Sequence, residues 1–361
     1  MSTTPQIQYG NGISETVISP DNPFAKKRPP QERQARQKFE PGTPWWWLDR
    51  LIMKLMDRMD RYDTLENYAL GYHPLPNLDY RYVRALRDLQ KKARTNYCEL
   101  VIRAPVERMK VKGFRFGPVG TADDDAKKIW DYNEMDYQSP LNLNIAATFG
   151  FCYALVSPPD PNDPDSQPGI CIEDPRTCIV ERNPYNPIKS IAGLKIWVDD
   201  ILETAIAMLY LPDYVYTFQA PKYHPEVVDQ DAFLTKQFSS FMEASGFELV
   251  LIQNNDLGEV PLIEGKWQPS FGDLGRSEHE GVLDIQDRIN HTVLDRLIIS
   301  KSQAYRQRWV SGAKFDASKG SPWDPGADIL WVTPEPEAKF GDFESADISQ
   351  LLDAIKDDIG D

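Results

Sequence analysis

Apolar residues recur at spacings of three and four over Trp45–Leu70, a pattern typical of an amphipathic helix. Three adjacent tryptophans open this segment, and Gly71 is expected to end it because glycine favours helix C-termini. The same periodicity predicts a long second helix over Tyr80–Arg108, and the acidic run at Asp123 predicts the start of a third. Proline at a first turn predicts a short helix over Pro140–Phe149.

From Phe151 the pattern changes to short segments of β-branched and aromatic residues, bounded by Pro, Asn, Asp and Gly. A single helix, around Phe233–Met242, is predicted among them. Helices followed by strands indicate an α+β fold. The predicted strands are Cys152–Val156, Ile170–Glu173, Thr177–Arg182, Gly193–Val198, Ala205–Leu211, Tyr214–Phe218, Phe247–Ile252 and Val260–Ile263.

Residues 277–310 differ from the rest because they contain no proline and only Gly281 as an internal break. Ser277 and Glu280 have capping-box spacing, so the segment predicts one helix on the order of 50 Å long, at about 1.5 Å per residue. Its single narrow apolar seam, flanked by charges of both signs, suits packing beside copies of the same helix. The seam consists of Val282, Ile285, Ile289, Val293 and Leu297.

The segments at either end are more polar. Residues 1–44 contain seven prolines and a basic stretch from Lys26 to Lys38, which predicts an extended arm. Residues 311–343 form an excursion punctuated by glycine and proline, with one predicted strand at Asp328–Val332. Apolar spacing then predicts an acidic amphipathic helix over Asp347–Ile359.

Composition narrows the function classes. The 361 residues carry a net charge of −15, with 41% hydrophobic and 26% charged residues. Too many aromatic residues are present for general disorder, and no apolar run is long enough to span a bilayer. The acidic balance argues against tight nonspecific nucleic-acid binding, which depends on Lys and Arg at phosphates. The polar start, Met1–Gly10, lacks a signal-peptide pattern, so we expect synthesis in the cytoplasm.

No motif indicates catalysis, because neither a Walker A sequence nor a GxSxG nucleophile elbow is present. We therefore expect a protein that is not an enzyme and binds no cofactor or metal. An acidic hydrolase with an aromatic cleft stays open as an alternative, since carboxylates are abundant. The four histidines are expected to be structural, and the four cysteines to be buried free thiols: His73, His224, His279 and His291, and Cys98, Cys152, Cys171 and Cys178.

The order of several segments resembles the portal proteins of tailed double-stranded DNA phages, in the Gp6-like siphophage group. The resemblance covers about residues 46–359 and rests on joint order rather than on one motif. In the family as in this chain, the matching segments are followed by a long helix (here 277–310), an excursion (311–343) and an acidic helix (347–359). The segments are Tyr68–Leu75, Asn96–Val101, Pro105–Phe114, Trp130 with Asn133, Ala146–Val156, Glu173–Arg176 and Val260–Ile263.

This resemblance implies a portal fold with a mixed α/β wing, long stem helices and a small α/β clip, assembled as a ring of about 12 subunits. By it, residues 1–44 are an N-terminal arm, 46–276 the wing and 277–310 the first stem helix. Residues 311–343 are then the clip, and 347–361 the start of the second stem helix. The family's tunnel loop and crown would follow Asp361.

The implied function is a channel at one capsid vertex, through which double-stranded DNA is packaged and ejected. Implied partners are a terminase, head-to-tail connectors or adaptors, the major capsid protein and a scaffold, in the virion and, during assembly, the host cytoplasm. An acidic lumen would let the duplex slide. A minor head or connector protein is a further alternative. Expected channel-facing cations are Lys301, Arg306, Arg308 and Lys314, and expected clip docking residues are Trp323, Asp324, Pro325 and Trp331.

Overall fold

Helix α1 (Pro44–Ala69) begins at the tryptophan run, as the apolar periodicity predicts. The Thr43 hydroxyl accepts a hydrogen bond from the Trp46 backbone N–H at 3.3 Å, and Pro44 occupies the first turn, where no helical bond is lost. One face of α1 is buried along its length, through Leu48, Leu51, Ile52, Leu55, Met59, Tyr62 and Leu65.

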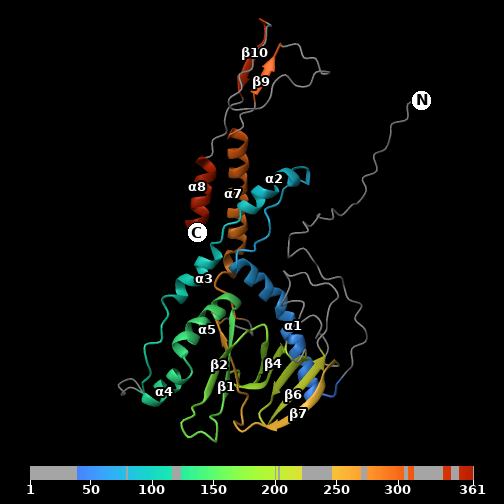
Figure 1. Cartoon of the computed structure of the whole chain (residues 1–361), viewed down its shortest axis with the longest axis vertical. Helices are drawn as coiled ribbons and strands as arrows, with labels where there is room; N and C mark the ends of the chain where they lie inside the picture. Colours follow the sequence, from blue (N-terminus) through green and yellow to red (C-terminus); the bar gives the residue numbers. More distant parts are fainter. Residues whose placement is uncertain are drawn as a thin grey trace, which may run out of the picture.

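The computed structural model describes residues 39–78, 80–115, 123–199, 201, 204–221, 246–269, 275–304, 308–312, 336–342 and 349–360. Two sheets lie at one end of the molecule, and a long helix leads from them to a small β-hairpin at the other end (Figure 1). Three sequence predictions lie outside the described residues: most of the arm, the helix at 233–242 and the strand at 328–332.

The strands form an antiparallel five-stranded sheet in the order β3-β4-β5-β6-β7 and a three-stranded sheet in the order β2-β1-β8. All eight predicted strands are confirmed, with ends that differ from the predicted ones by three residues at most. Their bounds are β1 Phe151–Ser157, β2 Gly169–Glu173, β3 Cys178–Arg182, β4 Ser190–Asp199, β5 Thr204–Tyr210, β6 Tyr214–Pro221, β7 Glu248–Asn254 and β8 Leu262–Lys266.

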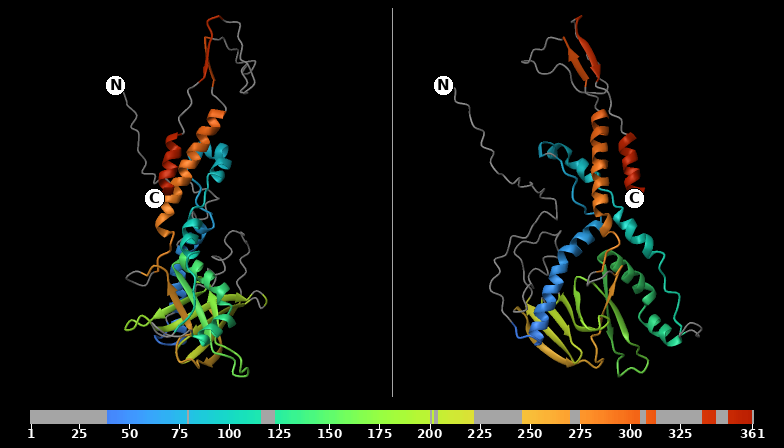
Figure 2. Two further views of the ribbon diagram at one scale, coloured as in Figure 1. Left: turned by 90° about the vertical axis from the view of Figure 1, so that its left-hand side faces the viewer. Right: turned by 180° about the vertical axis from the view of Figure 1, so that it is seen from behind.

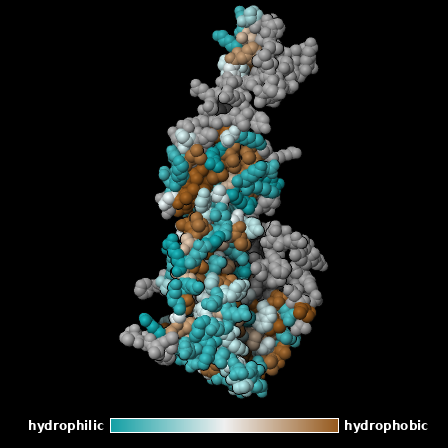
Figure 3. Space-filling model, turned by 60° about the vertical axis from the view of Figure 1, so that its left-hand side comes forward, coloured by the Kyte–Doolittle hydropathy of each residue, from teal (hydrophilic) through white to brown (hydrophobic). Residues whose placement is uncertain are grey.

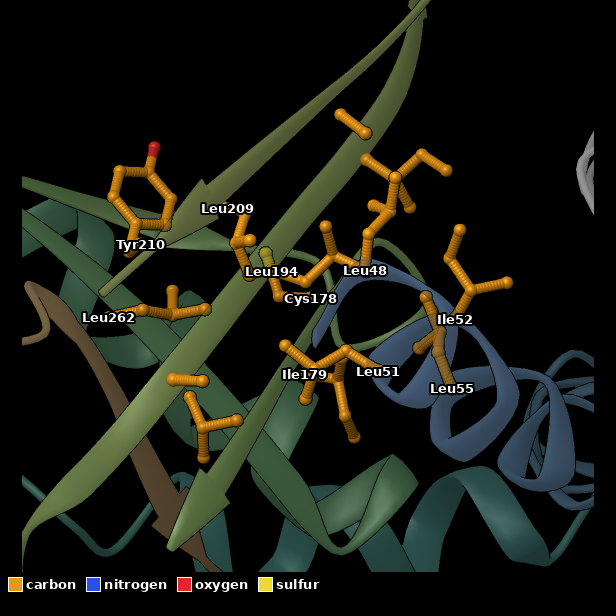
Figure 4. Packing of buried hydrophobic residues seen from close by; sticks show 14 of the residues in the cluster. Leu48, Leu51, Ile52, Leu55, Cys178, Ile179, Leu194, Leu209, Tyr210 and Leu262 are labelled. Atoms are coloured by element: carbon orange, nitrogen blue, oxygen red, sulfur yellow. The ribbon is translucent and has the colours of Figure 1, made fainter. Parts of the chain in front are cut away.

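The main core lies between α1 and the sheets (Figure 4). Leu48, Leu51 and Ile52 of α1 contact the same buried cluster as Ile179 of β3 and Leu194 of β4. Each of these large side chains is at most 2% exposed. Burial of such a side chain contributes about 1.5–3 kcal/mol, so this cluster fixes α1 on the sheets.

The single helix predicted over 80–108 is wrong, because the structure has α2 (Tyr80–Lys92) and α3 (Cys98–Val106) separated by the non-helical segment 93–97. Helix α4 (Asp124–Tyr132) starts where predicted, with the Asp123 carboxylate accepting a hydrogen bond from Ala126 N at 3.0 Å. Helix α5 (Met135–Phe149) begins before Pro140, which therefore lies inside the helix rather than in its first turn.

The helix predicted over 277–310 is shorter than expected. A 3₁₀ turn, η4 (Glu280–Val282), leads into α7 (Leu283–Ala304). Beyond it Arg308–Ser311 forms β9, which pairs with β10 (Lys339–Asp342). The helix cannot reach residue 310, since Trp309 and Val310 pair with a strand about 30 residues further along the chain. Helix α8 (Ser349–Gly360) returns alongside α7 (Figure 2).

Candidate functional site

The predicted apolar seam lies on α7, and the same chain buries its middle. Ile289 and Val293 are 2% and 7% exposed, in a cluster with Leu294 and Ala93. Ile285 and Leu297 are half-buried against this cluster, and Val282 is half-buried at η4. The seam was expected to pack beside copies of the same helix, but its middle is covered within the chain, and packing of the rest against other copies stays a prediction. The segment around α2 covers the middle of the seam, and periodicity on α7 cannot reveal that contact.

Two buried amides of α7 explain why helix 80–108 is broken. Asn290 Oδ1 accepts a hydrogen bond from the Thr95 backbone N–H at 2.9 Å, and Gln286 Oε1 accepts one from the Tyr97 N–H at 2.8 Å. A continuous helix would use these N–H groups within itself. Since Gln286 and Asn290 are at most 2% exposed, their side chains require partners, and the non-helical segment at 93–97 supplies them.

The end of α1 meets the start of α7 through buried histidines. His73 Nε2 donates to the Tyr68 carbonyl at 3.1 Å, and its Nδ1 accepts from Asn290 Nδ2 at 3.2 Å. His279 Nε2 lies 3.0 Å from the Leu65 carbonyl, and its Nδ1 lies 2.9 Å from the Ser277 hydroxyl. Burial lowers the pKa of both imidazoles, which favours their neutral forms. The two histidines thus act structurally, as expected.

An ion pair completes this contact. Arg61 of α1 donates to both carboxylate oxygens of Glu280, at 2.9 Å and 2.7 Å, and to the Gly275 carbonyl at 2.9 Å. These hydrogen bonds lower the pKa of the Glu280 carboxyl despite partial burial. We call the following residues the junction: Arg61, Tyr68, His73, Thr95, Ser277, His279, Glu280, Gln286, Asp287 and Asn290. The junction fixes the direction in which α7 leaves the sheets.

Helix α8 covers one side of α7 and leaves apolar side chains exposed beside that contact. Ile355 packs against the α7 cluster, and the Arg288 guanidinium lies 2.6 Å from the Asp358 carboxylate. Leu352 and Ile359 of α8 are 40% and 45% exposed. Apolar surface gathers at this height of the molecule in a space-filling view (Figure 3). The paired helices therefore present an apolar outer surface that the described part of the chain leaves uncovered.

The hairpin of β9 and β10 carries two exposed aromatic side chains at the far end of the molecule, Trp309 and Phe340. Trp309 lies opposite Gly341, and a Cβ at residue 341 would come within 2.5 Å of the indole ring. Glycine at this position therefore lets the indole lie flat across β10. No local signal in the sequence indicates these two residues, because a hairpin whose strands are about 30 residues apart gives no turn signal.

The other predicted site residues have mixed outcomes. Lys301 is exposed near the end of α7, and Arg308 begins β9. The remaining candidates lie outside the described residues: Arg306, Lys314, Trp323, Asp324, Pro325 and Trp331. No cluster of metal-ligating side chains occurs in the described ranges, and none of the helices there is long and apolar enough to cross a membrane. All four cysteines are free, but only Cys98 and Cys178 are buried as expected: Cys152 is half-buried on β1 and Cys171 is exposed on β2.

Comparison with known proteins gives two results. Residues 48–361 match the family described as phage portal protein, SPP1 Gp6-like. The portal protein of Mycobacterium phage D29 is 33% identical over 106 residues, which cover 27% of this chain and 22% of that protein. The portal protein of Mycobacterium phage L5 is 33% identical over 76 residues, covering 21% and 16%. The matched stretches thus span about a fifth of these relatives.

Proposed function

The chain belongs to the SPP1 Gp6-like family of phage portal proteins, and from this premise we propose that its copies form a ring at one capsid vertex. Double-stranded DNA would pass through the central channel during packaging and ejection. We propose 12 subunits per ring, a location in the virion after assembly in the host cytoplasm, and no catalytic role for the chain.

The observation that carries the proposal is the apolar outer surface of α7 and α8. Leu352 and Ile359 are large aliphatic side chains left exposed on α8, while Ile355 of the same helix is covered by α7. A cyclic assembly covers such a surface because each subunit offers one side forward and another backward. Burial at about 25 cal/mol per Å² would favour that contact in every copy of the ring.

The negative net charge of the chain supports the proposal of a channel through which DNA slides. The chain carries −15, so a ring of copies repels phosphate and forms few lasting ion pairs with the duplex. Lys301, exposed near the top of α7, is proposed to make brief phosphate contacts that centre the DNA. Arg306, Arg308 and Lys314 stay proposals of the same kind.

We propose that the sheets with α1–α5 form the wing, α7 and α8 the stem, and the segment from β9 to β10 the clip. Trp309 and Phe340 on the clip hairpin are proposed to contact the terminase and the head-to-tail connectors, with Trp323, Asp324, Pro325 and Trp331 nearby in sequence. The wing would contact capsid and scaffold proteins.

Two carboxylates introduced on α8 by substitution test whether the chain forms a ring. In the variant Leu352→Glu with Ile359→Glu, carboxylates replace two exposed aliphatic side chains that flank the contact of Ile355 with α7. We expect native mass spectrometry and negative-stain images of the unmodified chain to show rings with a through-channel, and the variant to yield monomers or short oligomers.

The matched control is Ala354→Glu, which adds charge at a small exposed position of the same helix. It should still form rings, because it removes no large apolar contact. Monomers of the unmodified chain at micromolar concentration would contradict the proposal, and so would unchanged rings in the double variant.

A further inference from the structure

Strand β7 is an exposed edge of the five-stranded sheet. Among the strands of the described ranges it pairs with β6 alone, and all seven of its residues are exposed. Four consecutive apolar residues lie in its middle: Leu249, Val250, Leu251 and Ile252, of which Val250 is 57% exposed. A long edge strand with aliphatic side chains on both faces is a template for addition of another strand.

The other sheet edges are protected by side chains. The Asn133 and Gln138 amide oxygens accept hydrogen bonds from the β2 backbone N–H groups of Ile170 and Ile172, at 2.7 Å and 3.1 Å. At β8 the guanidinium of Arg182 donates to the Glu264 carbonyl at 3.0 Å.

The edge of strand β3 is also bound by a side chain, because Lys54 Nζ donates a hydrogen bond to the Val180 carbonyl oxygen at 3.1 Å. Within the described ranges no comparable side chain reaches the outer backbone of β7. Among these four sheet edges, β7 is therefore the one whose outer backbone the described side chains leave uncovered.

The described chain begins next to this edge. Phe39 stacks on Trp45 with ring centroids 6.0 Å apart, and Trp45 packs edge-on against Phe218 of β6 at 4.9 Å. Phe218 in turn lies opposite Leu249 in the β6–β7 register. The 38 residues that precede Phe39 are thus tethered one strand away from the open edge.

One stretch of those residues has the composition of a strand. Ile13–Ser19 contains Thr16, Val17 and Ile18, follows an Asn-Gly turn signal, and ends before Pro20. The 19 residues from Pro20 to Lys38 span up to about 60 Å when extended, at about 3.3 Å per residue. Such a tether reaches every position along β7.

We propose that Ile13–Ser19 of the same chain binds β7 as an additional edge strand. Main-chain hydrogen bonds supply the affinity, and the flanking side chains pack beside the aliphatic residues of β7 on both faces. A short tether raises the effective concentration of its own segment to the millimolar range, which favours it over a segment from another copy. The inference is independent of the ring, since a monomer makes the same contact.

Hydrogen exchange of the full chain tests the contact. In Val17→Pro, a proline in the middle of the added strand removes a donor and disrupts pairing. We expect the outward-facing amides of β7 to exchange at least about tenfold faster in this variant than in the unmodified chain. Gln34→Pro, which lies in the tether, is the matched control and should leave the exchange of β7 unchanged.

A bismaleimide cross-link identifies the source of the strand. Ser14→Cys and Gln253→Cys are combined with Cys171→Ser, and light and heavy isotope-labelled protein are mixed before reaction. We expect cross-linked peptides of a single isotope label. Cross-links that join light and heavy chains would overturn the assignment to the same chain. Exchange of β7 that is equally fast in the unmodified chain and in Val17→Pro would overturn the contact itself.

Discussion

The Tyr68 hydroxyl donates a hydrogen bond of 2.8 Å to Asp287 Oδ2, joining the end of α1 to the start of α7 across 219 residues of sequence. The other oxygen, Asp287 Oδ1, is buried and has no hydrogen-bond partner in the part of the chain that the structure describes. Burial raises the pKa of both groups. The carboxylate therefore depends on this phenol for its hydrogen bonding.

Removing that phenol tests its importance for stability. Tyr68→Phe keeps the ring packing and leaves the Asp287 carboxylate without its donor, so we expect a loss of about 1–3 kcal/mol in the free energy of unfolding. Chemical denaturation measures it. Tyr72→Phe is the control, because Tyr72 is exposed and should change stability by less than about 0.5 kcal/mol. Equal stability of the two variants would contradict this view of the junction.

Asn290 organises the segment between α2 and α3. Asn290→Ala removes the acceptor for the Thr95 N–H and the donor to His73, leaving buried polar groups without partners. We expect a loss of about 2–4 kcal/mol, from two unsatisfied groups, and faster hydrogen exchange at residues 93–97. Asp295→Ala, at an exposed position of the same helix, should leave both unchanged.

The two buried histidines predict a pH dependence. Their pKa is lowered by burial in the folded protein, so the unfolded chain binds more protons as the pH falls below about 6.5. Stability should be full above that pH and should decline as the pH falls toward the lowered folded-state pKa. Asp287, whose pKa is raised, acts in the opposite sense and reduces the slope.

The free energy of unfolding, measured from about pH 7.5 down to about pH 5, should show this decline in stability. The combined variant His73→Gln with His279→Gln should be less stable at pH 7.5 and should lose most of the dependence. His291→Gln, at an exposed position of α7, is the control and should keep it. A decline that persists undiminished in the combined variant would assign the dependence to other groups.

Gly341 determines where the Trp309 indole can lie on the β9–β10 hairpin. In Gly341→Ala the new Cβ would come within 2.5 Å of the Trp309 ring, which must then move. If Trp309 contacts a docking partner, Gly341→Ala and Trp309→Ala should both reduce DNA packaging in an assembly assay, with rings still formed. Lys339→Ala is the control on the same strand. Normal DNA packaging in both variants would show that Trp309 does not contact a docking partner.

Local sequence patterns predicted much of this fold. Helix α1 and the eight strands follow from periodicity and from Gly, Pro, Asn and Asp at the turns, because those signals act within a few residues. The start of α4 is likewise set by the neighbouring Asp123. The order of these elements along the chain also indicated the family, which residues 48–361 match.

Only the tertiary structure decided how α7 is covered and where it ends. Gln286 and Asn290 bind a segment about 190 residues earlier, which breaks the helix predicted over 80–108 and buries Ile289 and Val293 within the chain. Trp309 pairs with Gly341 and becomes a strand instead of a helical turn. The apolar pattern along one helix indicates which side chains must be buried. The residues that bury them come from distant parts of the sequence, and only folding brings them into contact.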